Sequence, residues 1–356
     1  RVGADEFAVL LRGVGDGAAA LKVAEGLLAR FAQPFAAGER EFGAGASIGV
    51  AAAIKGDAGA CVNAYADIAL NQAKKSGSHR VILHAPETRT HAAARLDLEA
   101  AMRAAISNGE LELNYQPIVR LSDGGLSGWE ALARWRRAGG DVVSPAEFIP
   151  IAEETGFITE LGVWALTQAA EDASNFGAMG APADAFISVN LSPRQLLHSE
   201  ALEGALASAI RLYPNIKLEV TETAIVDNPE RALVTLQRLR ATGARLALDD
   251  FGTGASSLAM LNRYPFSTLK IDRAFVEDQG AHAANVLRCI VGLARALGLE
   301  TVAEGVEDEE GRAMLALIGA TYGQGYFFGR PEPADKVIKR LTSATPVASS
   351  LALSAG

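Results

Sequence analysis

The sequence predicts an α/β protein in which a TIM-like (β/α)8 barrel follows a smaller, partial α/β segment. From residue 110 on, eight strand-like apolar runs occur, most of them separated by helical patterns. Such an alternation is typical of a sheet covered by helices, and eight units favour a closed barrel. An open doubly wound sheet is the alternative. A shorter alternation of the same kind occupies residues 1–84, and a helical connector at 85–109 separates the two parts.

The first segment contains three strand-like runs and two helical patterns. The predicted strands are Phe7–Leu11, Ser47–Ala52 and Arg80–Leu83, and the predicted helices are Gly17–Phe31 and Cys61–Lys74. The break at residues 85–87 ends this pattern, so we expect a domain boundary near residue 84.

The connector is expected to be a helix over 88–107. Its apolar residues recur at helical spacing, and the pair Asn108-Gly109 is a typical C-terminal cap. We therefore place the second domain at 110–341. The residues 342–356 are rich in Ser, Ala and Thr and are expected to form a loose tail.

Eight strands are predicted in the second domain. These are Leu111–Ile118, Leu126–Leu132, Ala185–Leu191, Ile216–Glu222, Arg245–Asp250, Thr268–Ile271, Thr301–Glu304 and Tyr322–Phe328. In a barrel of this kind the chemistry lies at the carboxyl ends of the strands.

Polar side chains occur at most of these strand ends. They are Glu130, Asn190, Glu219, Glu222, Asp249, Asp250, Lys270, Asp272, Glu304, Glu307 and Gln324. Any one of these residues is as readily explained as a solvated charge at a strand end. Five or more acids at one rim would repel each other unless a cation neutralised them. Oxygen ligands without a Cys or His pattern favour Mg²⁺ or Mn²⁺, and two such ions about 3.5–4 Å apart are typical of phosphoryl-ester hydrolysis.

Two of these acids, Asp249 and Asp250, are adjacent, and a regular strand would point them to opposite faces. Gly252 and Gly254 follow and permit a kink. We expect the chain to bend there, so that both carboxylates reach the same pair of ions.

Composition excludes several other classes of function. The net charge of -9 argues against a general duplex-DNA or anionic-membrane surface. The two cysteines lie far apart and form no metal-binding pattern, which favours a reduced cytoplasmic setting. No run of about 18 uncharged apolar residues is present. Because the chain begins at Arg1 without a signal peptide, we expect a fragment whose missing N-terminal part is a place for a sensor or membrane anchor.

Eight motifs in the second part resemble the EAL phosphodiesterase family, in order and at matching spacing. They are YQPIV (115–119), EALARW (130–135), SVNLS (188–192), LEVTE (218–222), DDFGTGASSL (249–258), LKID (269–272), AEGVE (303–307) and QGYFFGRP (324–331). The resemblance covers about 95–341 and implies hydrolysis of cyclic di-GMP to linear pGpG on a TIM-like barrel.

The resemblance also implies a role for each matching residue. Glu130, Asn190, Glu219, Asp249 and Asp250 would be metal ligands, and Glu130 would be needed for catalysis. Lys270 would hold the attacking water, and Glu304 would be its base or a further ligand. Gln324 would orient the site, Arg134 would face a substrate phosphate, and Gln116 would contact the ligand. Glu222 would brace the 249–258 loop, with Thr253, Ser256 and Ser257 as candidate partners.

Ion chemistry adds an expectation about inhibition. Ca²⁺ accepts the same oxygen ligands as Mg²⁺ but in a looser and larger shell. We therefore expect Ca²⁺ to support binding of the substrate and to inhibit its cleavage.

The first part resembles the second half of a GGDEF diguanylate cyclase domain. RVGADEFAVLL (1–11), SIGVA (47–51) and ADIALNQAKKSGSHRV (66–81) carry the likeness. Ala4 replaces a glycine of the motif and Asn71 a tyrosine, so the segment is expected to be degenerate and unable to make cyclic di-GMP. GTP is a candidate ligand there in the full-length protein, and a homodimer is a candidate assembly. The alternatives to an enzyme are a silent cyclic di-GMP receptor and an interaction domain.

Overall fold

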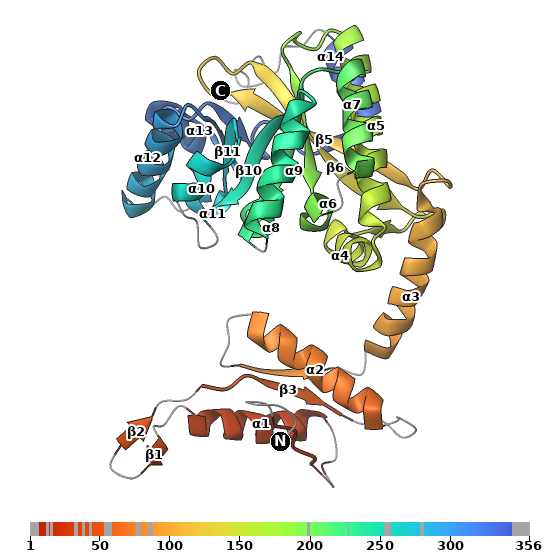
Figure 1. Ribbon diagram of the computed structural model, residues 1–356, viewed down its shortest axis with the longest axis vertical. Helices are drawn as coiled ribbons and strands as arrows, with labels where there is room; N and C mark the ends of the chain where they lie inside the picture. The colour runs from red at the N-terminus through yellow and green to blue at the C-terminus, as the bar shows by residue number, and fades with distance from the viewer. Residues whose placement is uncertain are drawn as a thin grey trace, which may run out of the picture. The chain divides into compact units, whose positions relative to one another are not determined.

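The computed structural model describes residues 7–11, 14, 17–31, 35–37, 40–42, 45–52, 59–75, 80–84, 88–197, 200–226, 228–252, 258–277 and 281–343. The chain divides into two compact units, Arg1–Asp97 and Leu98–Gly356 (Figure 1).

The first unit contains two small sheets and two helices. Its elements are α1 (Gly17–Phe31), β1 (Phe35–Ala37), β2 (Arg40–Phe42), β3 (Ile48–Ala51), α2 (Gly59–Lys75) and β4 (Val81–His84). The strands β3 and β4 pair in parallel, and β1 and β2 form an antiparallel pair. Helix α2 packs closely on β3, because a Cβ at Gly49 would lie 2.2 Å from the carbonyl oxygen of Ala66.

One strand predicted for this unit is wrong. Residues 7–11 are irregular, and Phe7, Val9 and Leu10 are largely exposed. Strand pairing is nonlocal, so an apolar run alone does not determine it. The two predicted helices are confirmed as α1 and α2.

The connector is the helix α3 (Thr88–Ala105), as predicted. Its end is stabilised as a C-terminal cap should be: the amide of Asn108 donates to Ala104 O at 2.9 Å, and Gly109 adopts φ +65°. The boundary between the two units falls within this helix.

The second unit is a closed barrel of eight strands. These are β5 (Leu111–Arg120), β6 (Leu126–Arg136), β8 (Phe186–Leu191), β9 (Ile216–Thr221), β10 (Arg245–Phe251), β11 (Thr268–Ile271), β12 (Glu300–Ala303) and β13 (Tyr322–Gln324). The hydrogen-bonded order is β5-β13-β12-β11-β10-β9-β8-β6, and pairing of β5 with β6 closes the ring. The predicted barrel is confirmed, and the open sheet is wrong.

One strand of the barrel runs against the others. Strand β5 is antiparallel to both of its neighbours, β6 and β13, whereas the remaining barrel pairs are parallel. The reason is the short connection 121–125, whose turn contains Gly124 at φ +72°. A turn this short joins only antiparallel strands, since a parallel crossover needs a dozen or more residues.

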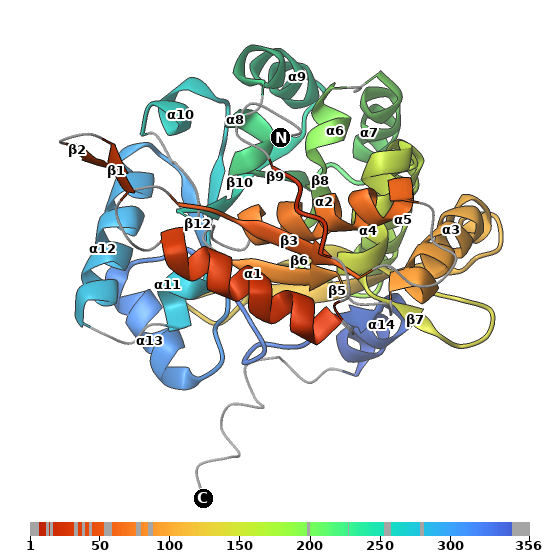
Figure 2. The ribbon, with the colours of Figure 1, turned by 90° about the horizontal axis from the view of Figure 1, so that it is seen from below.

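Helices cover the outside of the barrel (Figure 2). They are α4 (Pro145–Thr155), α5 (Ile158–Ala178), α6 (Pro193–Leu197), α7 (Glu200–Leu212), α8 (Glu222–Val226), α9 (Pro229–Ala241), α10 (Leu258–Arg263), α11 (Arg273–Glu277), α12 (Ala281–Ala296), α13 (Glu309–Ile318) and α14 (Ala334–Thr342). Two short strands, β7 (Val142–Val143) and β14 (Glu332–Pro333), extend the sheet at β6 and β5. No helix in the described part of the chain is long and apolar enough to cross a membrane.

Two predicted strands are too long. The run Tyr322–Phe328 leaves the sheet after Gln324, where the amide of Phe328 donates to Gly325 O at 3.1 Å and forms a turn. The run Ile216–Glu222 ends at Thr221, and Glu222 begins helix α8.

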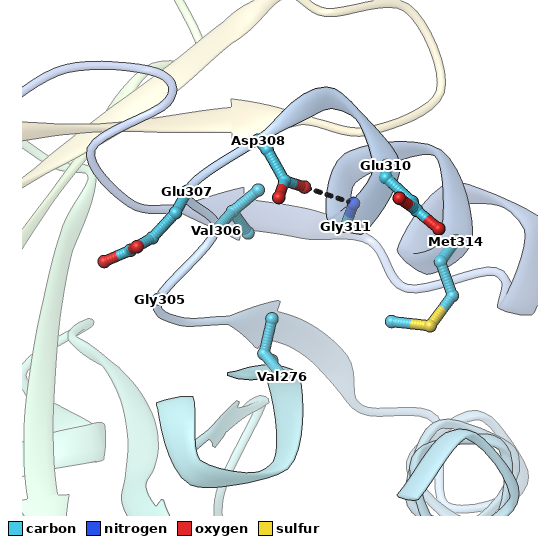
Figure 3. Close-up of a pocket in the computed structure, with 8 residues that line it drawn as sticks. All are labelled: Val276, Gly305, Val306, Glu307, Asp308, Glu310, Gly311 and Met314. Carbon is cyan, nitrogen blue, oxygen red and sulfur yellow. Dashed lines mark hydrogen bonds between the residues drawn. The ribbon is translucent and has the colours of Figure 1, made fainter. Parts of the chain in front are cut away.

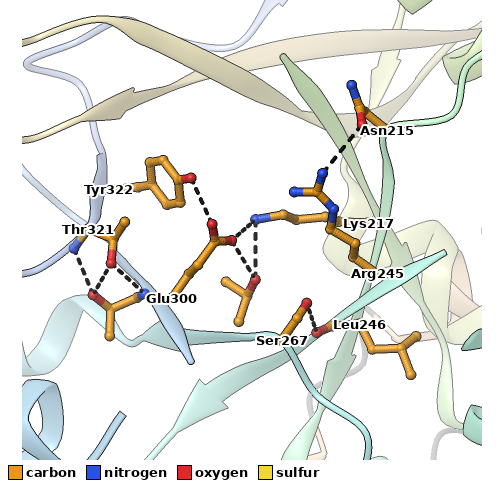
Figure 4. A network of polar contacts seen from close by, with 10 residues as sticks. Asn215, Lys217, Arg245, Leu246, Ser267, Glu300, Thr321 and Tyr322 are labelled. Carbon is orange, nitrogen blue, oxygen red and sulfur yellow. Dashed lines mark hydrogen bonds and ion pairs between the residues drawn. The ribbon is translucent and has the colours of Figure 1, made fainter. Parts of the chain in front are cut away.

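An ion pair between the buried Lys217 and the partly exposed Glu300 lies at the amino-terminal end of the barrel (Figure 4). Lys217 Nζ lies 2.9 Å from Glu300 Oε2 and 3.7 Å from the centre of the Phe186 ring. The hydroxyl of Tyr322 donates to Glu300 Oε1 at 3.0 Å. These residues stand at or near the first position of β9, β12, β8 and β13, so the contacts link strands at the rim opposite the predicted site.

Candidate active site

Lys270 lies at the centre of a cluster of carboxylates at the carboxyl rim. Its Nζ is 2.6 Å from Glu219 Oε2, 2.6 Å from Glu304 Oε1, 3.1 Å from Asp249 Oδ1 and 3.7 Å from Glu130 Oε2. The five side chains come from β6, β9, β10, β11 and the end of β12. Closure of the barrel therefore brings together residues that are up to 174 positions apart, from 130 to 304.

Two amides hold the carboxylate of Glu130. Asn190 Nδ2 donates to Glu130 Oε1 at 2.7 Å, and Gln324 Nε2 donates to Glu130 Oε2 at 2.6 Å. Gln324 Nε2 also donates to Gln116 Oε1 at 3.2 Å. Gln116 reaches the site because β5 pairs with β6 in a register that places it opposite Glu130.

The adjacent aspartates lie where β10 is irregular. The register of β10 against β11 shifts between Leu248 and Phe251, and Asp250 has φ +55°, the one non-glycine positive φ among the described residues. The amide of Asp250 donates to Asp249 Oδ1 at 3.0 Å. The predicted bend at the pair is present, and it begins at Asp250 itself.

Burial and charge perturb the titration of this cluster. Although burial opposes it, the carboxylates raise the pKa of Lys270 well above its usual value, so the ammonium stays charged. Burial raises the pKa of Glu219 well above its usual value and that of Glu304 to about 7. For Glu130, burial is outweighed by Lys270, Gln324 and Asn190, which lower its pKa. Burial and the charge of Asp249 raise the pKa of Asp250.

The site has more negative than positive charge. Four carboxylates surround the ammonium of Lys270, and Asp250 adds a fifth nearby. Such an excess is stable when a further cation shares it. The oxygens of Glu130, Asn190, Glu219, Asp249 and Asp250 are the hard donors that Mg²⁺ and Mn²⁺ prefer, so donor chemistry and charge both fit a divalent ion.

In the structure, the four carboxylates surround the ammonium of Lys270. Within the described part of the chain, no three Asp, Glu, His or Cys side chains are grouped so that they could hold a metal ion. The ligand set therefore stays a prediction.

A cavity of about 250 Å³ opens at the cluster. It is lined by Gln116, Glu130, Leu132, Asp249, Lys270, Arg273, Glu304, Gly305, Glu307, Gln324, Gly325 and Tyr326. Six of the predicted site residues are among them, and Asn190 and Glu219 contact this group through Glu130 and Lys270.

Five predicted site residues do not line the cavity, and besides Asn190 and Glu219 these are Arg134, Asp250 and Glu222. Arg134 is half-buried on β6, donates to Ala133 O at 2.9 Å, and has its pKa lowered by burial. Asp250 is partly buried next to Asp249 and is not among the lining residues. Glu222 is buried at the start of α8, and its candidate partners Thr253, Ser256 and Ser257 lie outside the described residues. Its bracing role stays a prediction.

The cavity also contains residues that sequence reasoning missed. Arg273 follows the LKID motif directly, and Tyr326 follows the Gly of QGY. Tyr326 is exposed, with the guanidinium of Arg330 4.0 Å from its ring centre. Arg273 lies directly beyond one strand-end motif and Tyr326 lies within another, QGYFFGRP (324–331), and this position is the signal that could have found them.

Comparison with protein families gives two matches. The EAL domain model matches residues 99–331, and the model described as diguanylate cyclase, GGDEF domain, matches residues 1–80. The bifunctional diguanylate cyclase/cyclic di-GMP phosphodiesterase MucR of Pseudomonas aeruginosa is 36% identical over 347 residues, covering 95% of this chain and 50% of that protein.

A second relative and a solved structure are also similar to this chain. The cyclic di-GMP phosphodiesterase PdeR of Escherichia coli is 34% identical over 340 residues, covering 94% of this chain and 51% of that protein. The chain thus spans about half the length of these curated relatives. Among solved structures, the PaMucR phosphodiesterase in complex with c-di-GMP is 37% identical with a TM-score of 0.63, covering 68% of this chain and 99% of that one.

Proposed function

Because this chain belongs to the EAL domain family, we propose that its barrel hydrolyses cyclic di-GMP to linear pGpG with divalent metal ions. The relatives MucR and PdeR are named as cyclic di-GMP phosphodiesterases, which supports this substrate. The observation that carries the proposal is the cluster of four carboxylates around Lys270 at the mouth of a cavity.

The residues that would hold the ions are Glu130, Asn190, Glu219, Asp249 and Asp250. Bound there, divalent ions would polarise the phosphoryl oxygens and acidify the attacking water. Side chains would orient the water and accept its proton. The ammonium of Lys270 orients the water, and Glu304 accepts its proton, for which a pKa of about 7 is well suited.

The remaining polar groups would hold the substrate. Gln116 and Gln324 lie in the cavity with side-chain amides that are able to contact a phosphate or sugar oxygen. Arg134 would reach a second phosphate from β6. Its lowered pKa reflects a half-buried guanidinium, and binding an anion would offset the cost of that burial.

The test is chromatography of cyclic di-GMP incubated with the purified chain and Mg²⁺ or Mn²⁺. The wild type should produce pGpG, and Glu130→Ala should produce none, because it loses the carboxylate that Asn190 and Gln324 hold. The matched control is Glu230→Ala in α9, since the side chain of Glu230 is 81% exposed and forms a surface ion pair with Arg263. Tight binding without turnover in the wild type would favour the receptor alternative. Full turnover by Glu130→Ala would contradict its assignment as a ligand.

We further propose that residues 1–80 bind GTP in the full-length protein without forming cyclic di-GMP. The match to the GGDEF domain supports the binding, and the replacement of a motif glycine by Ala4 argues against cyclisation. We place both activities in the cytoplasm, where the two cysteines would stay reduced.

A further inference from the structure

The segment 304–307, which leaves strand β12, separates two cavities. One side lines the catalytic cavity with Glu304, Gly305 and Glu307. The other side lines a second cavity of about 340 Å³, together with Val276 of α11 and Met314 of α13 (Figure 3). With a cavity on either side, packing alone does not fix the position of this segment.

Backbone hydrogen bonds tie the segment to the turn that follows β13. The amide of Val306 donates to Gln324 O at 3.0 Å, and the amide of Phe327 donates to Val306 O at 3.1 Å. Val306 is itself buried. Both polar backbone groups of one residue are thus bonded to the turn 324–327.

Two glycines allow the backbones to approach this closely. A Cβ at Gly325 would lie 2.0 Å from Val306 O and 2.3 Å from Val306 N, which no side chain tolerates. Gly305 adopts φ +73°, and a Cβ there would lie 2.4 Å from the Cβ of Arg273. We call the arrangement of Gly305, Val306 and Gly325 with its two hydrogen bonds the Val306 clasp.

We propose that the Val306 clasp positions Glu304 and Gln324 relative to each other across Lys270. The proposal rests on the proposed function. Glu304 precedes Val306 by two residues and places Oε1 2.6 Å from Lys270 Nζ, and Gln324 precedes Gly325 and places Nε2 2.6 Å from Glu130 Oε2. Gly325 and Gly305 are positioning residues, because they act through the backbone and carry no reacting group.

The second cavity gives the segment 304–307 space to move when the Val306 clasp is broken. If the clasp opens, the segment 304–307 has about 340 Å³ of space into which it can withdraw, and Glu304 moves with it. A displacement of about 1 Å at the reacting centre can cost about 100-fold in rate. Groups on other strands, such as Gln116 and Arg134, would still bind the substrate, so the loss should fall on kcat.

The direct test is Gly325→Ala. Its backbone φ is not positive, so the methyl acts only by colliding with Val306. We expect kcat for cyclic di-GMP to fall about 100-fold while KM changes much less.

Two control variants separate positioning from loss of stability. Gly177→Ala in α5 adds a methyl with nothing within 4 Å and should leave kcat unchanged. Leu315→Ala in α13 removes a fully buried side chain and should lower the melting temperature while kcat of the folded protein persists.

Hydrogen exchange gives a readout that does not depend on activity. The amides of Val306 and Phe327 should exchange faster in Gly325→Ala than in the wild type, and not in Gly177→Ala. Unchanged exchange at both amides, or a wild-type kcat in Gly325→Ala, would overturn the proposal. If the wild type itself shows no turnover, the proposed function fails, while the exchange rates still decide whether Gly325 holds the clasp.

Discussion

At the scale of single residues, the proposed role of Glu304 as the base can be tested directly. Its pKa of about 7, raised by burial, suits a group that takes a proton near neutral pH. Glu304→Gln keeps the shape and an oxygen to accept from Lys270, but removes the basic carboxylate. We expect kcat to fall about 10²–10⁴-fold, the usual contribution of general base catalysis. Steady-state kinetics with Mg²⁺ measures it, and a kcat within a few-fold of the wild type would exclude Glu304 as the base.

The oxygen donors of the same cluster predict how different ions behave. Ca²⁺ prefers about 2.3–2.6 Å to oxygen and 6–8 ligands, whereas Mg²⁺ requires a near-octahedral shell at about 2.0–2.1 Å. Ca²⁺ should therefore neutralise Asp249 and Asp250 and permit binding of cyclic di-GMP, but misplace the water. Calorimetry in Ca²⁺ should show binding, and adding Ca²⁺ to a Mg²⁺ reaction should inhibit it. Equal rates in the two ions would contradict this expectation.

At the scale of elements, the ion pair at the amino-terminal rim links β9 to β12. The side chain of Lys217 is 1% exposed, whereas that of Glu300 is 36% exposed. Removing Glu300 leaves a buried ammonium without its carboxylate, which costs up to about 3–5 kcal/mol. Removing the charge of Lys217 leaves a carboxylate that water and the hydroxyl of Tyr322 can still solvate.

We therefore expect Glu300→Ala to lower the free energy of unfolding clearly more than Lys217→Met. Urea unfolding measures both. Asp335→Ala, which breaks the exposed pair with Lys339, is the control and should change the free energy of unfolding by about 0–1 kcal/mol. If Lys217→Met lost more free energy of unfolding than Glu300→Ala, the burial of Lys217 would not explain which variant is less stable.

At the scale of the whole molecule, the proposed catalytic and substrate-binding groups all lie in the second unit. Gln116, Glu130, Lys270 and Gln324 fall within Leu98–Gly356, and the solved PaMucR structure aligns with 68% of this chain. We expect a fragment of residues 85–356 to fold and to retain the kcat of the whole chain. Circular dichroism and turnover by the two proteins check this. A folded fragment without activity would place part of the active site in the first unit.

Much of the fold follows from the sequence alone. Local patterns determine helices such as α1 and α3, and the strand-end acids Glu130, Asp249 and Glu304 were predicted to meet because parallel strands end at one rim. The strand-end motifs are short and local, so each can be read without knowing its neighbours.

Other features depend on which segments meet in space. The pairing of β5 with β13, the convergence of four carboxylates on Lys270 and the Val306 clasp all join segments that are not neighbours in the sequence. Residues 7–11 show the same limit, since an apolar run becomes a strand only through a partner. The sequence by itself determined the elements and the chemical character of the rim, because these depend on local propensity and residue type. Only the tertiary structure decided direction, register and distance, because those are set by contacts between distant segments.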